Sequence, residues 1–333
     1  MINLLKKIKK TQAGCIIFNC IYRKDCLLLT NPPVNDKKVS MKFTKMHGCG
    51  NDYIYFDCTK TDFPVGAEGE KAAAIKLSDR HFGIGGDGII LIKKGHTADF
   101  EMVMYNADGS RSQMCGNGIR CVGKYVYDAG YTQGREFTVE SMGAVKHLNV
   151  IQGERGEKET WLSVDMGAPI LEAEKIPVAG PSTGSGTPKR VIMHPLTIAG
   201  KEYKITCVSM GNPHAVVFID KKPAEFDVCG IGPLFENDPF FPERTNTEFA
   251  YVEDRHTIWM RVWERGTGET LACGTGTCAT VVAAILNNLV DAGTPVTVHL
   301  VGGDLKIEWS GREEDSVFMT GPAENVFTGD VSL

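Results

Sequence analysis

Two cysteines stand in the same local sequence at distant places in the chain. Cys115 is followed by Gly-Asn-Gly and Cys273 by Gly-Thr-Gly, and each tripeptide opens a segment with the apolar spacing of an α-helix. A thiol at a helix start lies near unpaired backbone N–H groups and the positive end of the helix dipole. Both effects predict a pKa lowered from about 8.5 toward neutrality. We therefore interpret both cysteines as acid–base groups.

The residues after each cysteine suit an anionic ligand. The glycines let the backbone approach a bound molecule closely, and the N–H groups of the first helical turn form a site for a carboxylate. Two facing copies would hold one carboxylate between two helix N-termini, with a sulfur on either side of the neighbouring carbon. One thiolate would remove the α-proton while the opposite thiol delivers a proton to the other face. This pattern predicts a two-base racemase.

Other uses of the cysteines remain open at this point. A single Cys-Gly-x-Gly is typical of a packing residue, but its duplication favours a function. Two facing thiols would also suit a redox pair. The spacings of Cys115 to Cys121 and of Cys273 to Cys278, without nearby histidines, do not favour zinc, so no metal site is predicted. Cys121 and Cys278 fall on the helix bodies, and we expect them to be packing residues.

The segments before the cysteines are duplicated as well. The two cysteine motifs are 158 residues apart (273 minus 115), and residues 102–106 align with residues 260–264 at the same offset. Gly50-Asn51 matches Gly211-Asn212 at an offset of 161 (212 minus 51). Landmarks at nearly constant spacing indicate one fold used twice. We expect two homologous, pseudo-symmetric domains that face each other.

Local patterns predict the elements of each domain. Residues 88–92, 100–105, 214–219 and 257–263 are β-rich, and glycine-containing turns follow several of them. The clearest helices cover residues 118–129 and 276–289, and the second is apolar nearly all round, which predicts burial. The fold class is therefore α+β, with a β-structure wrapped around one central helix in each domain. Residues 181–188 are expected to form a surface loop.

Composition narrows the class of protein. Charged residues make up 23% and apolar residues 42% of the 333 residues, with a net charge of -5, which is typical of a globular chain of about two domains. The mild acidity gives no basic patch for nucleic acid or an anionic membrane. Eleven cysteines in so long a chain suit the cytoplasm better than a disulfide scaffold. We expect a small-molecule substrate.

Residues 1–40 differ in kind from the rest. Several lysines precede a short apolar stretch at residues 15–22, which Asn19 interrupts and which is too short to span a bilayer. No small-residue cleavage site follows, so a signal peptide is not favoured. We interpret these residues as an extension or a non-native start, disordered and dispensable, before a domain that begins at Met41.

Several motifs in order resemble the diaminopimelate epimerase family. They are residues 47–52 (His-Gly-Cys-Gly-Asn-Asp), 106–110 (Asn-Ala-Asp-Gly-Ser), 115–121 (Cys-Gly-Asn-Gly-Ile-Arg-Cys), 211–214 (Gly-Asn-Pro-His), 263–270 (Trp-Glu-Arg-Gly-Thr-Gly-Glu-Thr) and 272–276 (Ala-Cys-Gly-Thr-Gly). The resemblance covers residues 41–333. It implies an N-terminal domain at 41–158, a C-terminal domain at 159–318 and a closing strand at 319–333 that returns to the first domain.

The resemblance implies a cofactor-independent homodimeric isomerase that interconverts L,L- and meso-2,6-diaminopimelate for lysine and peptidoglycan synthesis. Cys115 would be the proton donor and Cys273 the proton acceptor, with His214 and Glu264 beside them. The backbones of Gly116-Asn117 and Gly274-Thr275 would hold the reacting carboxylate. The other substrate contacts implied are Asn51, Asn106, Asn212, Asn246, Glu264 and Arg265.

These residue types suit a substrate with a second, distant amino-carboxylate group. Arg265 supplies a partner for the carboxylate and Glu264 one for the amine, while asparagines can contact both. By the repeat, Glu264 takes the position of Asn106, and Asn246 that of Gly88. Gly88 departs from the polar side chain that the family often has there, so a side-chain contact is expected to be lost.

The sequence has no pyridoxal lysine motif, dinucleotide fingerprint or Walker loop. Without a cofactor, removal of a weakly acidic α-proton requires a desolvated thiolate and a closed cleft, so we expect the domains to close on the substrate. Proline and hydroxyproline racemases, which resemble this fold and use two cysteines, are the nearest alternative. Phenazine-biosynthesis isomerases use a carboxylate instead, and a non-catalytic thiol-redox or ligand-binding protein is a further alternative.

Overall fold

The structure is a computed structural model that describes residues 39–112, 114–179 and 189–333. Most of the expected extension, residues 1–38, and the expected loop at 181–188 lie outside the described residues. The first strand, β1, begins at Ser40, one residue before the predicted domain start. Among the described residues, no helix combines the length and apolar character needed to cross a membrane.

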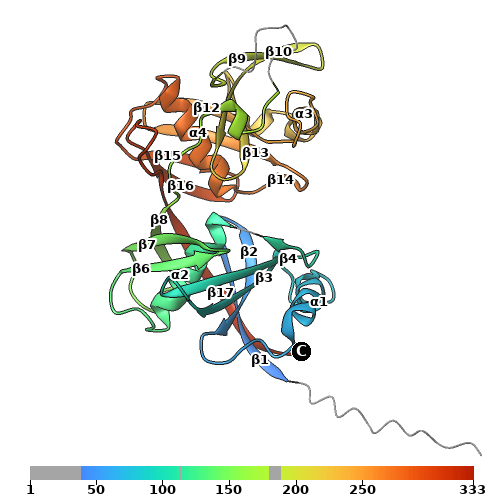
Figure 1. Ribbon diagram of the computed structural model, residues 1–333, viewed down its shortest axis with the longest axis vertical. Coiled ribbons are helices and arrows are strands. Elements are labelled where there is room, and N and C mark those ends of the chain that lie inside the picture. The colour runs from blue at the N-terminus through green and yellow to red at the C-terminus, as the bar shows by residue number, and fades with distance from the viewer. Residues whose placement is uncertain (1–38, 113, 180–188) are drawn as a thin grey trace, which may run out of the picture. The chain divides into compact units, whose positions relative to one another are not determined.

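The first half of the described chain contains eight strands and two α-helices (Figure 1). They are β1 (Ser40–Gly48), β2 (Asn51–Cys58), α1 (Gly66–Ser78), β3 (Gly88–Lys94), β4 (Phe100–Asn106), β5 (Arg111–Ser112), α2 (Gly116–Asp128), β6 (Glu136–Ser141), β7 (Ala144–Gln152) and β8 (Glu159–Asp165). The predicted strands at 88–92 and 100–105 are therefore present, and each is slightly longer than predicted.

The second half repeats this order and adds one strand and two 3₁₀ helices. Its elements are the 3₁₀ helix η1 (Ala173–Lys175), β9 (His194–Ile198), β10 (Lys201–Ser209), β11 (Pro213–Phe218), the 3₁₀ helix η2 (Pro223–Glu225), α3 (Val228–Glu236), β12 (Asn246–Asp254), β13 (Thr257–Glu264), β14 (Gly268–Thr270), α4 (Gly274–Leu286), β15 (Val296–Leu300), β16 (Gly303–Glu308) and β17 (Phe318–Ser332).

Strand pairing shows that the two halves share one topology. In the first half β2 is parallel to β3, β3 is antiparallel to β4, and β4 is parallel to β6. In the second half β11 and β12, β12 and β13, and β13 and β15 pair in the same three ways. The predicted fold class, one α+β unit used twice, is confirmed.

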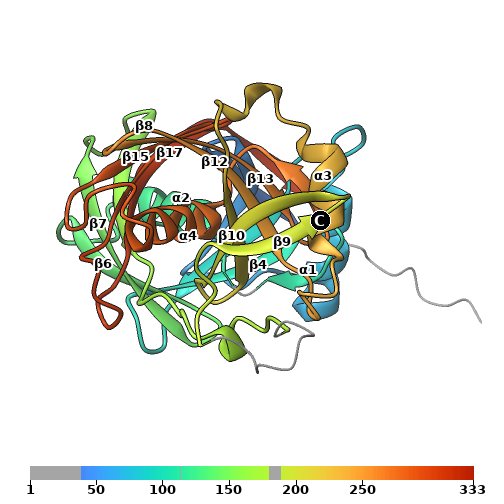
Figure 2. The ribbon, with the colours of Figure 1, turned by 90° about the horizontal axis from the view of Figure 1, so that it is seen from above.

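A helix lies inside the strands of each half, as Figure 2 shows for α2 and α4. Ten residues of α4 are buried, because its Ala, Val and Thr side chains leave no polar face. The helix α2 ends at Asp128, and Gly130 adopts a φ of 72°, which favours glycine after a helix C-terminus. Both helices begin two residues earlier than predicted, because Cys115 and Cys273 are the N-cap residues.

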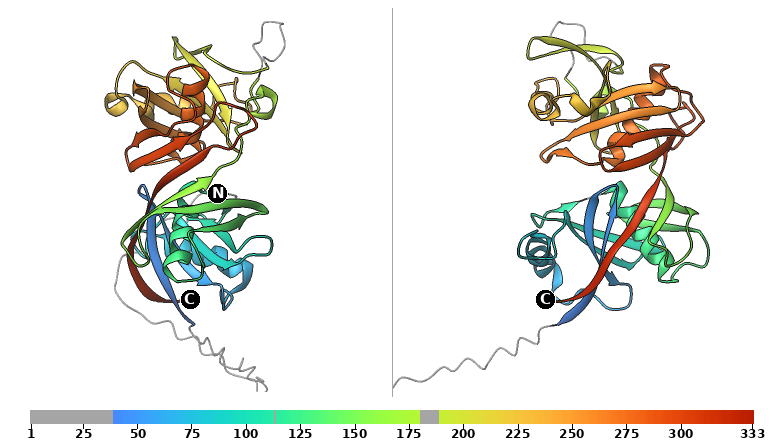
Figure 3. Two further views of the ribbon diagram at one scale, coloured as in Figure 1. Left: turned by 90° about the vertical axis from the view of Figure 1, so that its left-hand side faces the viewer. Right: turned by 180° about the vertical axis from the view of Figure 1, so that it is seen from behind.

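The last strand connects the halves. β17 pairs with β16 through Lys306↔Thr320, with β8 through Val164↔Met319, and with β1 up to Ser40↔Ser332. Figure 3 shows β17 in red running from the second half along β1. Alternate side chains of β8 (Thr160, Leu162 and Val164) point into the core beside it. The boundaries 41–158, 159–318 and 319–333 stay predictions.

Candidate active site

A large open cleft, about 1970 Å³ in volume, lies where α2 and α4 begin. Residues from both halves of the chain line it. Most of the predicted site residues are among them: Asn51, Asn106, Cys115, Gly116, Asn117, Asn212, Glu264, Arg265, Cys273, Gly274 and Thr275. His214 and Asn246 do not line the cleft and are buried behind it.

The N-termini of the two helices lie against each other. A Cβ atom placed on Gly116 would lie 3.6 Å from the Cα atom of Gly274, and one on Gly274 would lie 3.5 Å from the Cα of Gly116. Met319 of β17 fills the adjacent space. The Asn117 side chain donates to the carbonyl of Ala272 at 3.3 Å. The first turns of both helices, whose N–H groups lack carbonyl partners within the helix, are thus brought to one place.

Cys115 is half-buried at the start of α2. Its sulfur accepts the N–H of Gly118 at 3.3 Å, and its thiol donates to Oδ1 of Asn51 at 3.1 Å. The Asn51 amide nitrogen donates in turn to Oδ2 of Asp87 at 2.6 Å. The thiol therefore has a fixed partner on β2.

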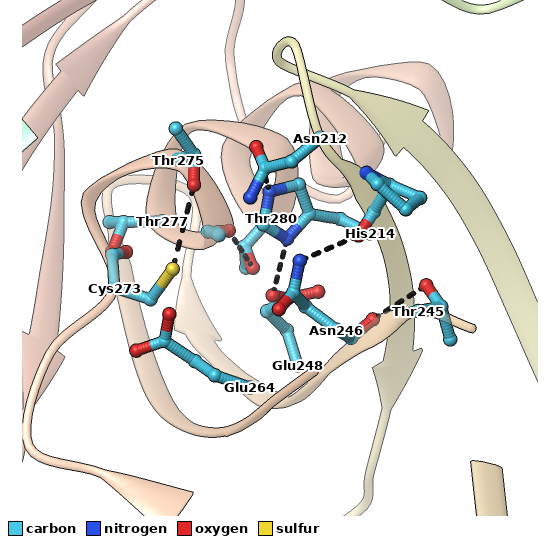
Figure 4. A network of polar contacts seen from close by, with 12 residues as sticks. Asn212, His214, Thr245, Asn246, Glu248, Glu264, Cys273, Thr275, Thr277 and Thr280 are labelled. Atoms are coloured by element: carbon cyan, nitrogen blue, oxygen red, sulfur yellow. Dashed lines mark hydrogen bonds and ion pairs between the residues drawn. The ribbon is translucent and has the colours of Figure 1, made fainter. Parts of the chain in front are cut away.

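Cys273 is 5% exposed at the start of α4 and has different neighbours. Its sulfur lies 3.5 Å from Oγ1 of Thr275. The Glu264 carboxylate lies beside it (Figure 4) and accepts a hydrogen bond from Thr270. The buried environment raises the pKa of Glu264, while its hydrogen bonds to Thr270 and Cys273 act in the opposite direction.

The predicted lowering of the thiol pKa values is wrong. Burial raises the pKa of Cys115, although the N–H groups of Gly118 and Asn117 act against it. Burial also raises the pKa of Cys273 well above its ordinary value, and the negative charges of Glu264 and Glu248 add to the effect. Desolvation of a thiolate outweighs the helix N-terminus here. Both sulfurs therefore hold their protons at neutral pH.

His214 lies buried behind the cleft, in the second half of the chain. Its side chain is fully buried, with Nδ1 2.7 Å from Oε1 of Glu248 and Nε2 3.0 Å from Oδ1 of Asn212 (Figure 4). The other carboxylate oxygen of Glu248, Oε2, is buried without a hydrogen-bond partner among the described residues. Sequence analysis missed Glu248, because a glutamate within a strand gives no local signal of a partner 34 residues away.

The Asn246 side chain contacts the backbone of Arg265. The Asn246 amide donates to the carbonyl of Pro213 at 2.8 Å and accepts from the backbone N–H of Arg265 at 2.9 Å. The Arg265 guanidinium donates to the carbonyl of Glu243 at 3.0 Å. Asn246 therefore holds the cleft-lining residue Arg265 in place and has no free polar atom directed into the cleft.

The remaining predicted positions are Asn106, Gly88, Cys121 and Cys278. Asn106 donates to Oγ of Ser110 at 3.0 Å at the end of β4. At Gly88 a Cβ atom would lie 2.0 Å from the carbonyl oxygen of Tyr105, so this backbone admits no side chain there. Cys121 and Cys278 are fully buried, which agrees with their predicted packing role. No group of three or more metal-ligating side chains occurs in the described part of the chain.

The fold defines a class, the duplicated helix-centred β-fold that solved structures of an epimerase and an isomerase share. A hydroxyproline epimerase from Agrobacterium vitis with bound trans-4-hydroxy-L-proline has a TM-score of 0.63 and 13% identity, over 89% of this chain and 93% of that one. A phenazine biosynthesis protein of the PhzF family from Bacillus anthracis has a TM-score of 0.59 and 14% identity, over 89% and 100%. At this identity the likeness shows the fold alone.

Sequence comparison identifies the family within this class. The family model for diaminopimelate epimerase matches residues 43–172 and 206–326, and the chain belongs to the diaminopimelate epimerase family. The diaminopimelate epimerase of Agathobacter rectalis is 52% identical over 296 residues, which cover 88% of this chain and all of that protein. The diaminopimelate epimerase of Leptospira biflexa is 48% identical over 295 residues, 89% of this chain and all of that protein.

Proposed function

We propose that this protein interconverts L,L- and meso-2,6-diaminopimelate by proton transfer between Cys115, Cys273 and the substrate α-carbon. The observation that carries the proposal is the contact between the first turns of α2 and α4, which brings a thiol from each half to one cleft. Relatives about 50% identical over nearly their whole length carry this activity in their names. The protein would serve lysine and peptidoglycan synthesis in the cytoplasm, as a homodimer.

The reacting carboxylate would bind at the helix N-termini. The backbone N–H groups of Gly116, Asn117, Gly274 and Thr275 lie in the first turn of their helices, so no carbonyl of the preceding helical turn accepts from them. Two helix dipoles would stabilise the carboxylate and the charge that develops on it when the α-proton leaves. The absence of side chains at Gly116 and Gly274 leaves this approach open.

Proton transfer would use one ionised and one protonated sulfur, so one of the two thiols would first have to release its proton to solvent. With the L,L substrate, the Cys273 thiolate would take the α-proton and become a thiol, and the Cys115 thiol would give its proton to the opposite face and become a thiolate. The meso substrate would reverse the roles. Because burial raises both pKa values, a thiolate formed in the closed site is a strong base, which the weakly acidic α-proton requires.

The site would select diaminopimelate by its distant amino-carboxylate group. Arg265 and Glu264 line the same cleft as the thiols, and their charges suit a carboxylate and an ammonium group. Glu264 also lies beside Cys273, so it would influence that thiol as well as the amine. Domain closure would then exclude water from both sulfurs. A proline-type substrate, which lacks the distant group, is not favoured.

Proton NMR of L,L-diaminopimelate in D₂O tests the proposal. Reduced wild-type protein should exchange the α-proton and form the meso isomer, while Cys115→Ala and Cys273→Ala should each form none. Cys207→Ala, which removes a buried cysteine away from the cleft, should keep the activity. Exchange with proline but not with diaminopimelate would overturn the substrate assignment. Full epimerisation by either single-cysteine variant would overturn the mechanism.

A further inference from the structure

The two halves orient their equivalent asparagines in opposite ways. In the first half, Oδ1 of Asn51 faces the Cys115 sulfur at 3.1 Å and Nδ2 faces away from it. In the second half, Oδ1 of Asn212 faces Nε2 of His214 at 3.0 Å rather than the Cys273 sulfur. Only Cys115 has an asparagine carbonyl as the acceptor for its proton among the described residues. The two thiols therefore differ before any substrate binds.

Asp87 determines the direction of the Asn51 amide. Its Oδ2 accepts Nδ2–H of Asn51 at 2.6 Å and the backbone N–H of Asp52 at 3.1 Å. A carboxylate only accepts hydrogen bonds, so it must face the amide nitrogen of Asn51 and not the oxygen. The amide oxygen is then left for the thiol.

Asp87 is itself held from several sides. Arg80 donates to its Oδ1 at 2.9 Å and also contacts Asp52 at 2.7 Å. The Asp87 backbone N–H donates to the carbonyl of Asp52 at 2.7 Å, and its carbonyl accepts from Ala107 at 2.9 Å. This residue belongs to the glycine-rich segment 83–88, to which the proposed reaction assigns no role.

We propose that Asp87 is a positioning residue for Cys115: it holds the Asn51 amide so that the carbonyl oxygen, and not the NH₂ group, faces the thiol. This inference rests on the proposed function for its catalytic meaning. An S–H···O contact stabilises the protonated sulfur, whereas an N–H···S contact would stabilise the thiolate. Asp87 would thereby keep the proton on Cys115, which is the state that a proton donor needs.

Site-resolved alkylation tests the inference without use of the reaction. Iodoacetamide modification of Cys115 and Cys273 is followed by mass spectrometry against pH, because only the thiolate reacts. Asp87→Ala removes the acceptor and frees the amide to turn. Asp87→Asn removes the same charge but keeps an oxygen for Nδ2 of Asn51, so it is the matched control for electrostatics.

We expect Asp87→Ala to shift the pH dependence of Cys115 alkylation to lower pH by about one unit more than Asp87→Asn does. A shift of about one pH unit corresponds to the free energy of one exchanged hydrogen bond. The Cys273 profile should not move. In an Asn51→Ala background, Asp87→Ala and Asp87→Asn should give the same Cys115 profile. Equal shifts for both variants in the wild-type background would overturn the inference, as would a difference that persists without Asn51.

A second variant replaces Asp87→Ala if that variant does not fold. Asp87→Ser keeps a hydroxyl that can accept the N–H of Asp52 but is too short to reach Nδ2 of Asn51, and it is judged by the same criteria. Diaminopimelate turnover by wild-type protein is measured separately. If wild type lacks turnover, the proposed function fails while the alkylation result still decides the role of Asp87.

Discussion

The Cα atom of Gly274 lies 3.6 Å from the position that a methyl group on Gly116 would occupy. Each glycine is the first residue of a helix, and each follows one of the two thiols. The helices come from opposite halves of the chain, so this contact sets the separation of the two half-sites. The consequences for activity, thiol chemistry and stability can be measured.

Gly116→Ala should reduce activity more than stability. The nearest atom to the new methyl would be the flexible end of Met319, at 2.9 Å, and alanine favours the helix, so the free energy of unfolding should change by less than about 1 kcal/mol. The methyl would occupy the approach to the N–H groups of the first turn, where the substrate carboxylate would bind, so kcat/KM should fall at least about tenfold. Gly134→Ala, where nothing lies within 4 Å, is the control. Unchanged kcat/KM in Gly116→Ala would contradict the prediction.

Glu264→Gln should lower the pKa of Cys273. Burial is the first cause of the raised pKa of Cys273 and the Glu264 carboxylate the second, whereas at Cys115 the carboxylate ranks behind burial and the N–H groups of Gly118 and Asn117. Alkylation of Cys273 should therefore shift to lower pH, and more than that of Cys115. Epimerisation should fall about 100-fold or more. Glu269→Gln, which removes a carboxylate paired with Arg261, should leave both profiles unchanged. A shift of Cys273 to higher pH would refute this electrostatic account.

The folded state should lose stability at alkaline pH. Burial raises the pKa of both Cys121 and Cys278 from 9.0 to about 12. The unfolded chain therefore loses these protons first, so the stability is complete below about pH 9 and is lost as pH rises toward 12. Each thiol should contribute a slope of about 1.4 kcal/mol per pH unit in that window.

Urea unfolding under reducing conditions between about pH 8 and pH 10.5 measures this slope. Cys121→Ala should lower stability at every pH because it leaves a cavity, but its slope with pH should be smaller than in the wild type. A Cys121→Ala slope equal to that of wild type would show that this thiol does not carry the effect.

Arg120→Ala should destabilise the fold strongly. Arg120 is fully buried in α2, where it donates to the carbonyl of Gly116 at 3.0 Å, to Oδ1 of Asn117 at 2.9 Å and to the carbonyl of Pro322 at 3.2 Å. Its removal leaves these acceptors unpaired around a cavity, at a cost of about 3–5 kcal/mol. Arg312→Ala, at a side chain 71% exposed, should change the free energy by about 0.5 kcal/mol or less. Thermal and urea unfolding distinguish the two.

Much of the fold follows from local patterns. The strand predicted at residues 257–263 is β13, one residue longer, because alternating apolar residues mark a half-buried strand wherever it pairs. The helices were predicted to begin two residues late, since Gly116 and Gly274 carry no apolar side chain that would mark the first turn. The N-cap geometry of the preceding cysteines shows that the helices already include these glycines.

The site could be predicted less completely. The sequence placed both thiols at helix starts but indicated the wrong direction for their pKa values, because the burial that desolvates a thiol does not show in a local motif. Asp87 and Glu248 gave no signal either, since their partners Asn51 and His214 lie 36 and 34 residues away along the chain. A contact of that kind depends on strand pairing that the local pattern does not specify.

The sequence by itself determined that one fold is used twice and that Cys115 and Cys273 occupy equivalent helix starts, because repetition and periodicity are properties of the chain read locally. The tertiary structure decided how closely Gly116 and Gly274 approach, which way the Asn51 amide faces and how strongly each thiol holds its proton. These depend on desolvation and on contacts between residues far apart in sequence, and such terms exist only once the chain has folded.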